Sequence, residues 1–170
     1  MKNQFFIFLL ISILFFRCSN STSPNNDEKA FGIYLLKDTL LITSDAKKIP
    51  LNSLEVQDTP IININDIETY NWSEQIINLT PEAFKRFGSV ERKVKSIFGL
   101  PFIIMIDGTK IYLGNIYPGY SSYMHGDLPF IMVAPFTEMR ISRAPDKNIE
   151  DKRMDERIYL VLKNNNKIKI

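Results

Sequence analysis

Residues 101–114 read PFIIMIDGTKIYLG, and this stretch decides the fold that the sequence predicts. Residues 101–106 are apolar on both faces of an extended chain, which is typical of a central strand that is covered on both sides. The pair Asp107 and Gly108 is the strongest short signal for a tight hairpin turn. Residues 110–114 then return as an antiparallel strand, so the pattern predicts a hairpin within a sheet.

Shorter apolar runs predict further strands on either side of this hairpin. They lie at residues 31–36, 61–64, 75–79, 130–133 and 139–142. Two other segments have a less regular pattern. We expect residues 39–42 to form a strand or a short extension, and residues 65–72 to form a single turn that closes on aromatic contacts.

Two segments predict helices. Thr80 is a good N-cap and Pro81 suits the first helical position, and apolar residues then recur at helical spacing as far as Phe98. Gly99 ends this pattern, and Gly88 within it costs about 1 kcal/mol relative to alanine, so a break there is expected. Residues 149–163 predict the last helix.

These elements indicate an α+β fold, with a mostly antiparallel sheet and two helices packed on one face. We expect residues 30–170 to form a single globular domain, because no internal repeat or second boundary is visible. Residues 19–29 contain no apolar side chain, so residues 18–29 are expected to form a polar tether.

The first 17 residues have the pattern of a secretory signal. Lys2 precedes a mostly apolar run at residues 5–16, which matches the charged and hydrophobic regions of such a segment. As a helix this run would be roughly 18 Å long, whereas a bilayer core is about 30 Å thick. The sequence therefore predicts export rather than a membrane span.

Cys18, the only cysteine, directly follows this run and precedes a polar segment. In this respect residues 1–18 resemble a bacterial lipoprotein, and the resemblance implies a lipid on Cys18 that anchors the protein to a membrane. The residues before Cys18 are Phe15, Phe16 and Arg17, whereas the family has leucine, a small residue, and glycine or alanine. Ordinary signal-peptidase cleavage between small residues, at Ser19/Ser21 or Ser21/Ser23, is the alternative.

Charge excludes one class of partner. The chain has 21 Lys and Arg against 19 Asp and Glu, but residues 1–17 hold two of these bases and no acid. The rest of the chain is therefore neutral, and we expect no nucleic-acid partner. A single cysteine also excludes an intramolecular disulfide.

The sequence contains no recognisable catalytic or metal-binding set, and we expect no cofactor. His125 is the only histidine, which excludes most hydrolytic triads and nearly all multi-histidine metal sites. Carboxylates cluster in residues 146–156, where they alternate with lysines and arginines. A hydrolase would need two acids facing one cleft, whereas alternating charge on a helix is more typical of a solvated, salt-bridged face.

One loop remains as a candidate binding site. Residues 117–127 combine three tyrosines, two serines, a methionine and the only histidine. Tyrosine and serine are typical of binding loops, since they give rigid contact area and adaptable hydrogen bonds. The candidate residues are Tyr117, Tyr120, Tyr123, His125 and Asp127. The alternative is that the tyrosines cover the core and bond locally.

Residues 31–38, 66–72 and 111–114 resemble a group of small exported bacterial proteins that have no assigned activity, so the resemblance implies no reaction. The leading hypothesis is a lipid-anchored protein on the extracytoplasmic side of the cell envelope. It would be a non-catalytic module that binds a protein or a glycan. The alternatives are a carboxylate-dependent hydrolase of cell-wall glycan and a purely structural lipoprotein.

Overall fold

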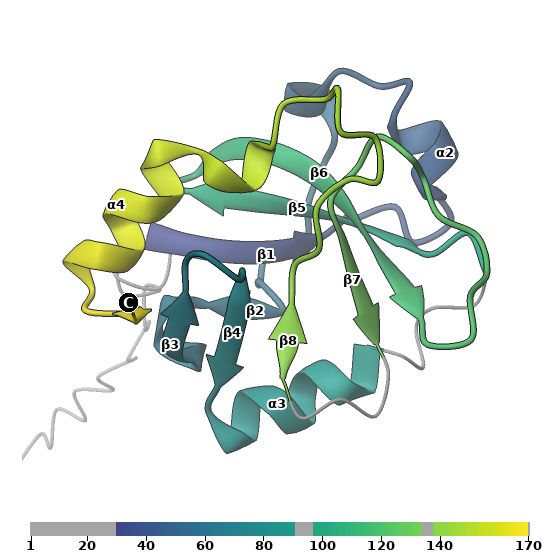
Figure 1. Cartoon of the computed structure of the whole chain (residues 1–170). Helices are drawn as coiled ribbons and strands as arrows, with labels where there is room; N and C mark the ends of the chain where they lie inside the picture. The colour runs from purple at the N-terminus through teal and green to yellow at the C-terminus, as the bar shows by residue number, and fades with distance from the viewer. Residues whose placement is uncertain (1–29, 91–96, 134–137, 170) are drawn as a thin grey trace, which may run out of the picture.

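The structure, a computed structural model, describes residues 30–90, 97–133 and 138–169 (Figure 1). The expected signal segment, Cys18 and the expected tether lie outside these residues. The described chain forms nine strands in two sheets, with three α-helices and three short 3-10 helices. The α+β class is confirmed, although one sheet was expected rather than two.

The larger sheet has the strand order β2-β1-β5-β6-β7. Its strands are β1 (Phe31–Leu35), β2 (Ile62–Asn63), β5 (Leu100–Ile106), β6 (Thr109–Pro118) and β7 (Phe130–Val133). The predicted hairpin joins β5 to β6, and both turn residues have positive φ, 47° for Asp107 and 78° for Gly108. These angles belong to a turn whose twist matches that of the flanking strands, so the central prediction is confirmed.

The smaller sheet has the order β8-β4-β3-β9. Its strands are β3 (Ile67–Asn71), β4 (Ile76–Leu79), β8 (Met139–Arg140) and β9 (Ile168–Lys169). Most strand pairs of the two sheets are antiparallel, as expected. However, β6 pairs with β7, and β3 with β9, in parallel, so both sheets are mixed.

Two predictions about the smaller segments were wrong. Residues 39–42 form no strand, and helix α2 (Thr43–Ala46) follows them directly. The expected turn at residues 65–72 is limited to its start, where a 3-10 helix (Ile64–Asp66) ends, and the following residues form strand β3, which lies between β4 and β9. Neighbours on both sides satisfy its backbone groups, which compensates for a sequence with few apolar residues.

The longer helices begin where side chains cap them. Helix α3 (Pro81–Gly88) starts after Thr80, whose Oγ1 accepts a hydrogen bond from the Ala83 N–H at 3.2 Å. It ends at Gly88, and residues 91–96 of the expected helix lie outside the described residues. Helix α4 (Glu156–Asn164) is shorter than expected because Asp155 is extended and caps it, and a separate 3-10 helix (Lys152–Met154) precedes it.

The main core lies between the two sheets, and α4 covers it from the side of β1, β5 and β9. A second, smaller apolar cluster lies on the other face of the larger sheet, under residues 36–56. Ile103 and Ile104 illustrate the division: they are adjacent in β5, fully buried, and belong to different clusters. Strand β5 is therefore covered on both faces, as predicted. No described helix is long and apolar enough to cross a membrane.

Candidate binding surface

The loop after β6 is built on two buried rings. Tyr117 is fully buried at the end of the strand, and its hydroxyl accepts a hydrogen bond from the His125 N–H at 2.5 Å. His125 as a whole residue is 7% exposed, and its ring lies against those of Tyr117 and Tyr123, with centroids 6.5 Å and 5.2 Å away. Tyr117 and His125 therefore support the loop and offer little contact area to a partner. For Tyr117 this agrees with the alternative that the tyrosines cover the core and form local hydrogen bonds.

His125 has an unusual environment for a titratable group. Its Nε2 is buried and has no hydrogen-bond partner among the described residues. Burial lowers the pKa of His125, the positive charge of Lys47 lowers it further, and Asp127 opposes both effects. The imidazole is therefore held in its neutral form at neutral pH.

Asp127 lies at the far end of the loop. Its carboxylate pairs with the Lys47 Nζ at 2.6 Å, which connects the loop to the end of helix α2. This ion pair satisfies the charge of Asp127, so its role in the structure is to join two segments.

Two of the candidate residues lie on the surface. Tyr120 is 71% exposed and Tyr123 is 38% exposed. The next side chain, Met124, is exposed as well, and so are Ile97 and Phe98 from a distant part of the sequence. The rings of Phe98 and Tyr123 meet edge to face, with centroids 5.1 Å apart. We call Ile97, Phe98, Tyr120, Tyr123 and Met124 the aromatic patch; none of its side chains is charged.

Hydrogen bonds hold the two halves of the aromatic patch together. The Ser121 Oγ donates to the Ile97 carbonyl at 2.8 Å. The buried Asn115 side chain donates to the Phe98 carbonyl at 2.9 Å and accepts from the Thr43 Oγ1 at 2.7 Å. Ile97 and Phe98 were missed because their apolar spacing was interpreted as the buried face of a helix.

Gly99 allows this arrangement. Its φ is +80°, and a side chain here would place a Cβ only 2.4 Å from the Asn115 Nδ2. Glycine is therefore required at position 99, because it adopts the positive φ and leaves room for the Asn115 side chain that bonds to the Phe98 carbonyl. This glycine was the one sequence signal for a turn at this position.

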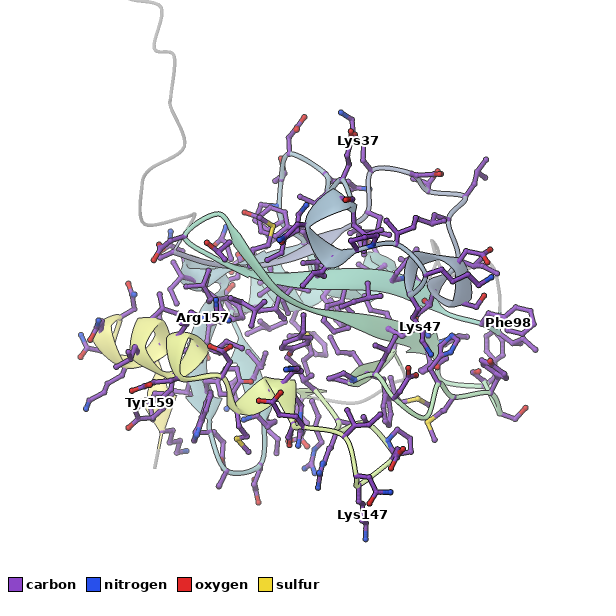
Figure 2. The ribbon with its side chains drawn as sticks, turned by 90° about the horizontal axis from the view of Figure 1, so that it is seen from above. Lys37, Lys47, Phe98, Lys147, Arg157 and Tyr159 are labelled. Atoms are coloured by element: carbon purple, nitrogen blue, oxygen red, sulfur yellow. The ribbon has the colours of Figure 1, made fainter. Side chains whose placement is uncertain are left out.

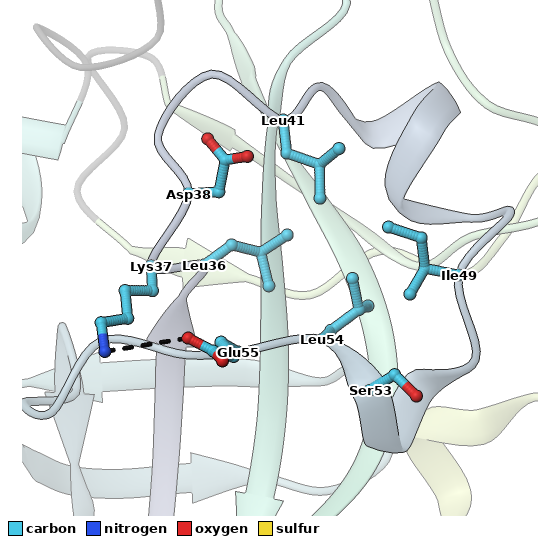
Figure 3. Close-up of a pocket in the computed structure, with 8 residues that line it drawn as sticks. All are labelled: Leu36, Lys37, Asp38, Leu41, Ile49, Ser53, Leu54 and Glu55. Atoms are coloured by element: carbon cyan, nitrogen blue, oxygen red, sulfur yellow. Dashed lines mark ion pairs between the residues drawn. The ribbon is translucent and has the colours of Figure 1, made fainter.

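Two hollows lie beside the smaller apolar cluster. One, about 460 Å³ in volume, opens under residues 36–55, where Leu36, Leu41, Ile49 and Leu54 point toward one another (Figure 3). Lys37 and Glu55 form an ion pair of 3.7 Å at its margin. The other, about 350 Å³, lies beside strand β6, and we call it the β6 groove. Its apolar walls include Ile49, Leu51, Leu54, Leu113, Leu128 and Ile149.

The acidic cluster is salt-bridged, as predicted, but part of it is not on a solvated face. Arg153 forms a two-pronged contact with Asp151, at 2.8 Å and 2.6 Å, and also donates to the Ile141 carbonyl at 2.7 Å. The side chains of Arg153 and Asp151 are only 11% and 18% exposed. The hydrogen bond from Arg153 lowers the pKa of Asp151.

Two of the four remaining acids of this segment also pair with neighbouring basic side chains. Asp155 pairs with Arg157 at 2.6 Å, and Glu150 pairs with Lys152. In the part of the chain that the structure describes, no group of three or more His, Cys, Asp or Glu side chains is placed to hold a metal ion. The arrangement offers contact area rather than an evident reaction centre.

No protein-family model matches the sequence, and neither the curated proteins nor the solved structures include a significant match.

Proposed function

We propose that this chain is an exported, lipid-anchored protein of the cell envelope that binds a protein or glycan partner, without catalysis, through the aromatic patch. The observation that carries the proposal is that two separate segments bring together the exposed rings of Phe98 and Tyr123. Three further exposed, uncharged side chains belong to the same two segments, namely Ile97, Tyr120 and Met124. Single exposed apolar residues are common, whereas a contiguous group of them often marks an interaction site.

The rigidity of the aromatic patch supports a binding role. Ser121 and Asn115 fix the backbone under Ile97 and Phe98 with hydrogen bonds, and buried rings fix the loop from below. A surface that is already ordered loses less conformational entropy when a partner binds. Tyrosine also contributes a large contact area for only two rotatable side-chain bonds.

The position of the aromatic patch supports a partner other than the anchoring membrane. Phe31 begins β1 and pairs with Ile106 at one end of β5, whereas Phe98 lies two residues before the other end. The two ends of β5 are about 20 Å apart. In Figure 2, Phe98 lies at one end of the molecule and Tyr159, on the helix next to β1, lies toward the other. An anchor at Cys18 would thus be attached to the domain, through the expected tether, at the end opposite the aromatic patch.

The two alternatives have less support. A glycan hydrolase that uses carboxylates alone needs two acids that face a substrate across one cleft. Three of the five acids in residues 146–156 instead pair with basic side chains, namely Asp151, Asp155 and Glu150. A purely structural lipoprotein needs neither an exposed aromatic group nor a concave site, and the described surface has both.

The test compares two double variants in intact cells. Tyr120→Ala with Tyr123→Ala removes the centre of the aromatic patch, and Leu40→Ala with Leu160→Ala removes two exposed apolar side chains elsewhere. A photo-cross-linking residue at Ser122, which is exposed, reports protein partners. Co-sedimentation with purified peptidoglycan sacculi reports glycan binding.

We expect the patch variant to lose a specific cross-linked product or sacculus binding while the control variant retains it. Both variants should keep the urea midpoint of the parent within experimental error, which shows that the fold is intact. The proposal is rejected if the patch variant and the parent give the same cross-links and the same sedimentation.

A further inference from the structure

The β6 groove contains an open strand edge. Strand β6 pairs with β5 from Thr109 to Ile116, but it pairs with β7 only from Asn115 to Pro118. The Asn115 N–H points away from β5, because it donates to the Pro129 carbonyl at 3.0 Å. Backbone directions repeat every second residue in a strand. The N–H and carbonyl of Leu113 therefore point to the same outer edge.

This edge has no partner within the described chain. If the parallel ladder continued, residue 129 would donate the next hydrogen bond to the Leu113 carbonyl, but Pro129 has no N–H. No described backbone or side-chain group bonds to Leu113 beyond β5. Leu113 is only 9% exposed, and backbone groups that are this buried are nearly always paired.

The walls of the groove suit one kind of occupant. Its apolar lining includes Leu51, Leu54, Leu128 and Ile149 together with Leu113 of strand β6. Ion pairs close the rim, Lys47 with Asp127 and Lys152 with Glu150. Because each ion pair is neutral, the groove favours an occupant without net charge.

We propose that the β6 groove binds an extended, apolar peptide segment of a partner protein, which adds to the edge of β6 as a short strand. The partner's backbone bonds to the N–H and carbonyl of Leu113, and a branched apolar side chain enters between Leu54 and Leu128. Strand addition of this type obtains affinity from main-chain hydrogen bonds and specificity from the side-chain pocket. A peptide supplies both the donor and the acceptor that the edge lacks, whereas an acyl chain supplies neither.

A synthetic peptide pair tests the backbone contact. The probe is the acetylated and amidated peptide Ser-Thr-Val-Leu-Val-Thr-Ser, and its control has the same sequence with N-methylated valine and leucine, which cannot donate. We expect the probe to bind the purified full-length protein, to shift the amide resonance of Leu113 and to slow its hydrogen exchange. The N-methylated control should bind about tenfold more weakly or not at all.

Protein variants test the pocket. Leu128→Lys places a charge in the groove and should weaken the probe about tenfold or more, whereas Leu40→Lys, at a site that is 88% exposed, should not. Tyr120→Ala with Tyr123→Ala should leave probe binding unchanged, so the groove and the aromatic patch can succeed or fail separately. Equal binding of the two peptides, or binding of dodecyl maltoside in the groove without any binding of the probe, would overturn the proposal.

Discussion

Arg153 is nearly buried, although the charged residues around it in the sequence suggest an exposed segment. The segment around it alternates in charge, yet its guanidinium is nearly buried and bonds to both Asp151 and the Ile141 carbonyl. Its bonds join the segment before α4 to the strand region after β8. Arg157 makes a similar two-pronged contact with Asp155, but its side chain is 54% exposed.

These two arginines give a matched prediction. Arg153→Ala leaves the Ile141 carbonyl without its donor and leaves the mostly buried Asp151 carboxylate with only the longer ion pair to Arg143, at 3.8 Å. We expect it to lower the free energy of unfolding by about 3 kcal/mol. Arg157→Ala should have a much smaller effect, because water replaces the lost contacts. Urea denaturation of both variants measures the difference, and equal losses would show that the Arg153 pair is no more important than a surface pair.

His125 predicts how stability depends on pH. Burial lowers the pKa of His125 in the folded protein below the usual histidine value near 6.5. As the pH falls, His125 therefore takes up a proton in the unfolded chain before it does so in the folded protein. The contribution of neutral His125 to stability is therefore complete above about pH 6.5 and decreases as the pH falls below that value. The lowered pKa of Asp151 has its own effect only below about pH 4.

We expect the free energy of unfolding to fall between about pH 7 and pH 5, and His125→Gln to remove most of this slope. Urea titrations at a series of pH values measure it, with chemical shifts of the imidazole to follow its protonation directly. A parent protein whose stability is constant across this range would contradict the prediction.

Among the elements, the β5–β6 hairpin and helix α3 use glycine for different reasons. Gly108 provides the positive φ that the tight turn requires, whereas Gly88 ends α3 without a positive φ. A Cβ would meet no heavy atom within 4 Å at either position. The same substitution at the two sites therefore changes the backbone energy and little else.

We expect Gly108→Ala to lower the free energy of unfolding by about 1 kcal/mol, because alanine adopts a positive φ only with strain. Gly88→Ala should raise it by up to about 1 kcal/mol, because alanine loses less backbone entropy in a helix. Thermal and urea unfolding of the two variants test the opposite signs. Effects of the same sign would mean that local backbone preference does not control these positions.

At the scale of the whole molecule, the arrangement of the strands separates the two ends of the domain. Phe31 lies at one end of the larger sheet, and the aromatic patch lies at the other. The β6 groove lies on the edge between them, beside the smaller apolar cluster. If the chain is anchored before residue 30, both candidate surfaces remain available to partners in the envelope.

The anchor itself is a prediction that mass spectrometry can test. We expect the mature protein from the membrane fraction to begin at Cys18 and to carry the mass of an acylated cysteine. Cys18→Ser should remove the added mass and release the protein into the soluble fraction. A wild-type mass that matches simple cleavage after Cys18 would show that no lipid is attached.

The features that could be predicted from the sequence depend on near neighbours along the chain. The hairpin at residues 107–108 follows from a turn that only a few residues form, and the start of α3 follows from the Thr80 cap. Periodicity also identified β1, β4 and β7 because each has enough apolar residues to show a pattern. In the candidate loop, the composition marked Tyr120 and Tyr123 but could not distinguish them from the buried Tyr117.

The remaining features depend on contacts between distant segments, and only the tertiary structure decides them. Strand β9 has two residues, too few to show a period, and β3 exists because β4 and β9 satisfy its backbone groups. Phe98 meets Tyr123 because Asn115 and Ser121 bond to the backbone of residues 97–98. The open edge at Leu113 likewise results from the place where β7 begins, since Pro129 ends the ladder there. Residue pattern determines which segments are extended or helical, whereas packing of the whole chain determines which of them meet and which groups remain unpaired.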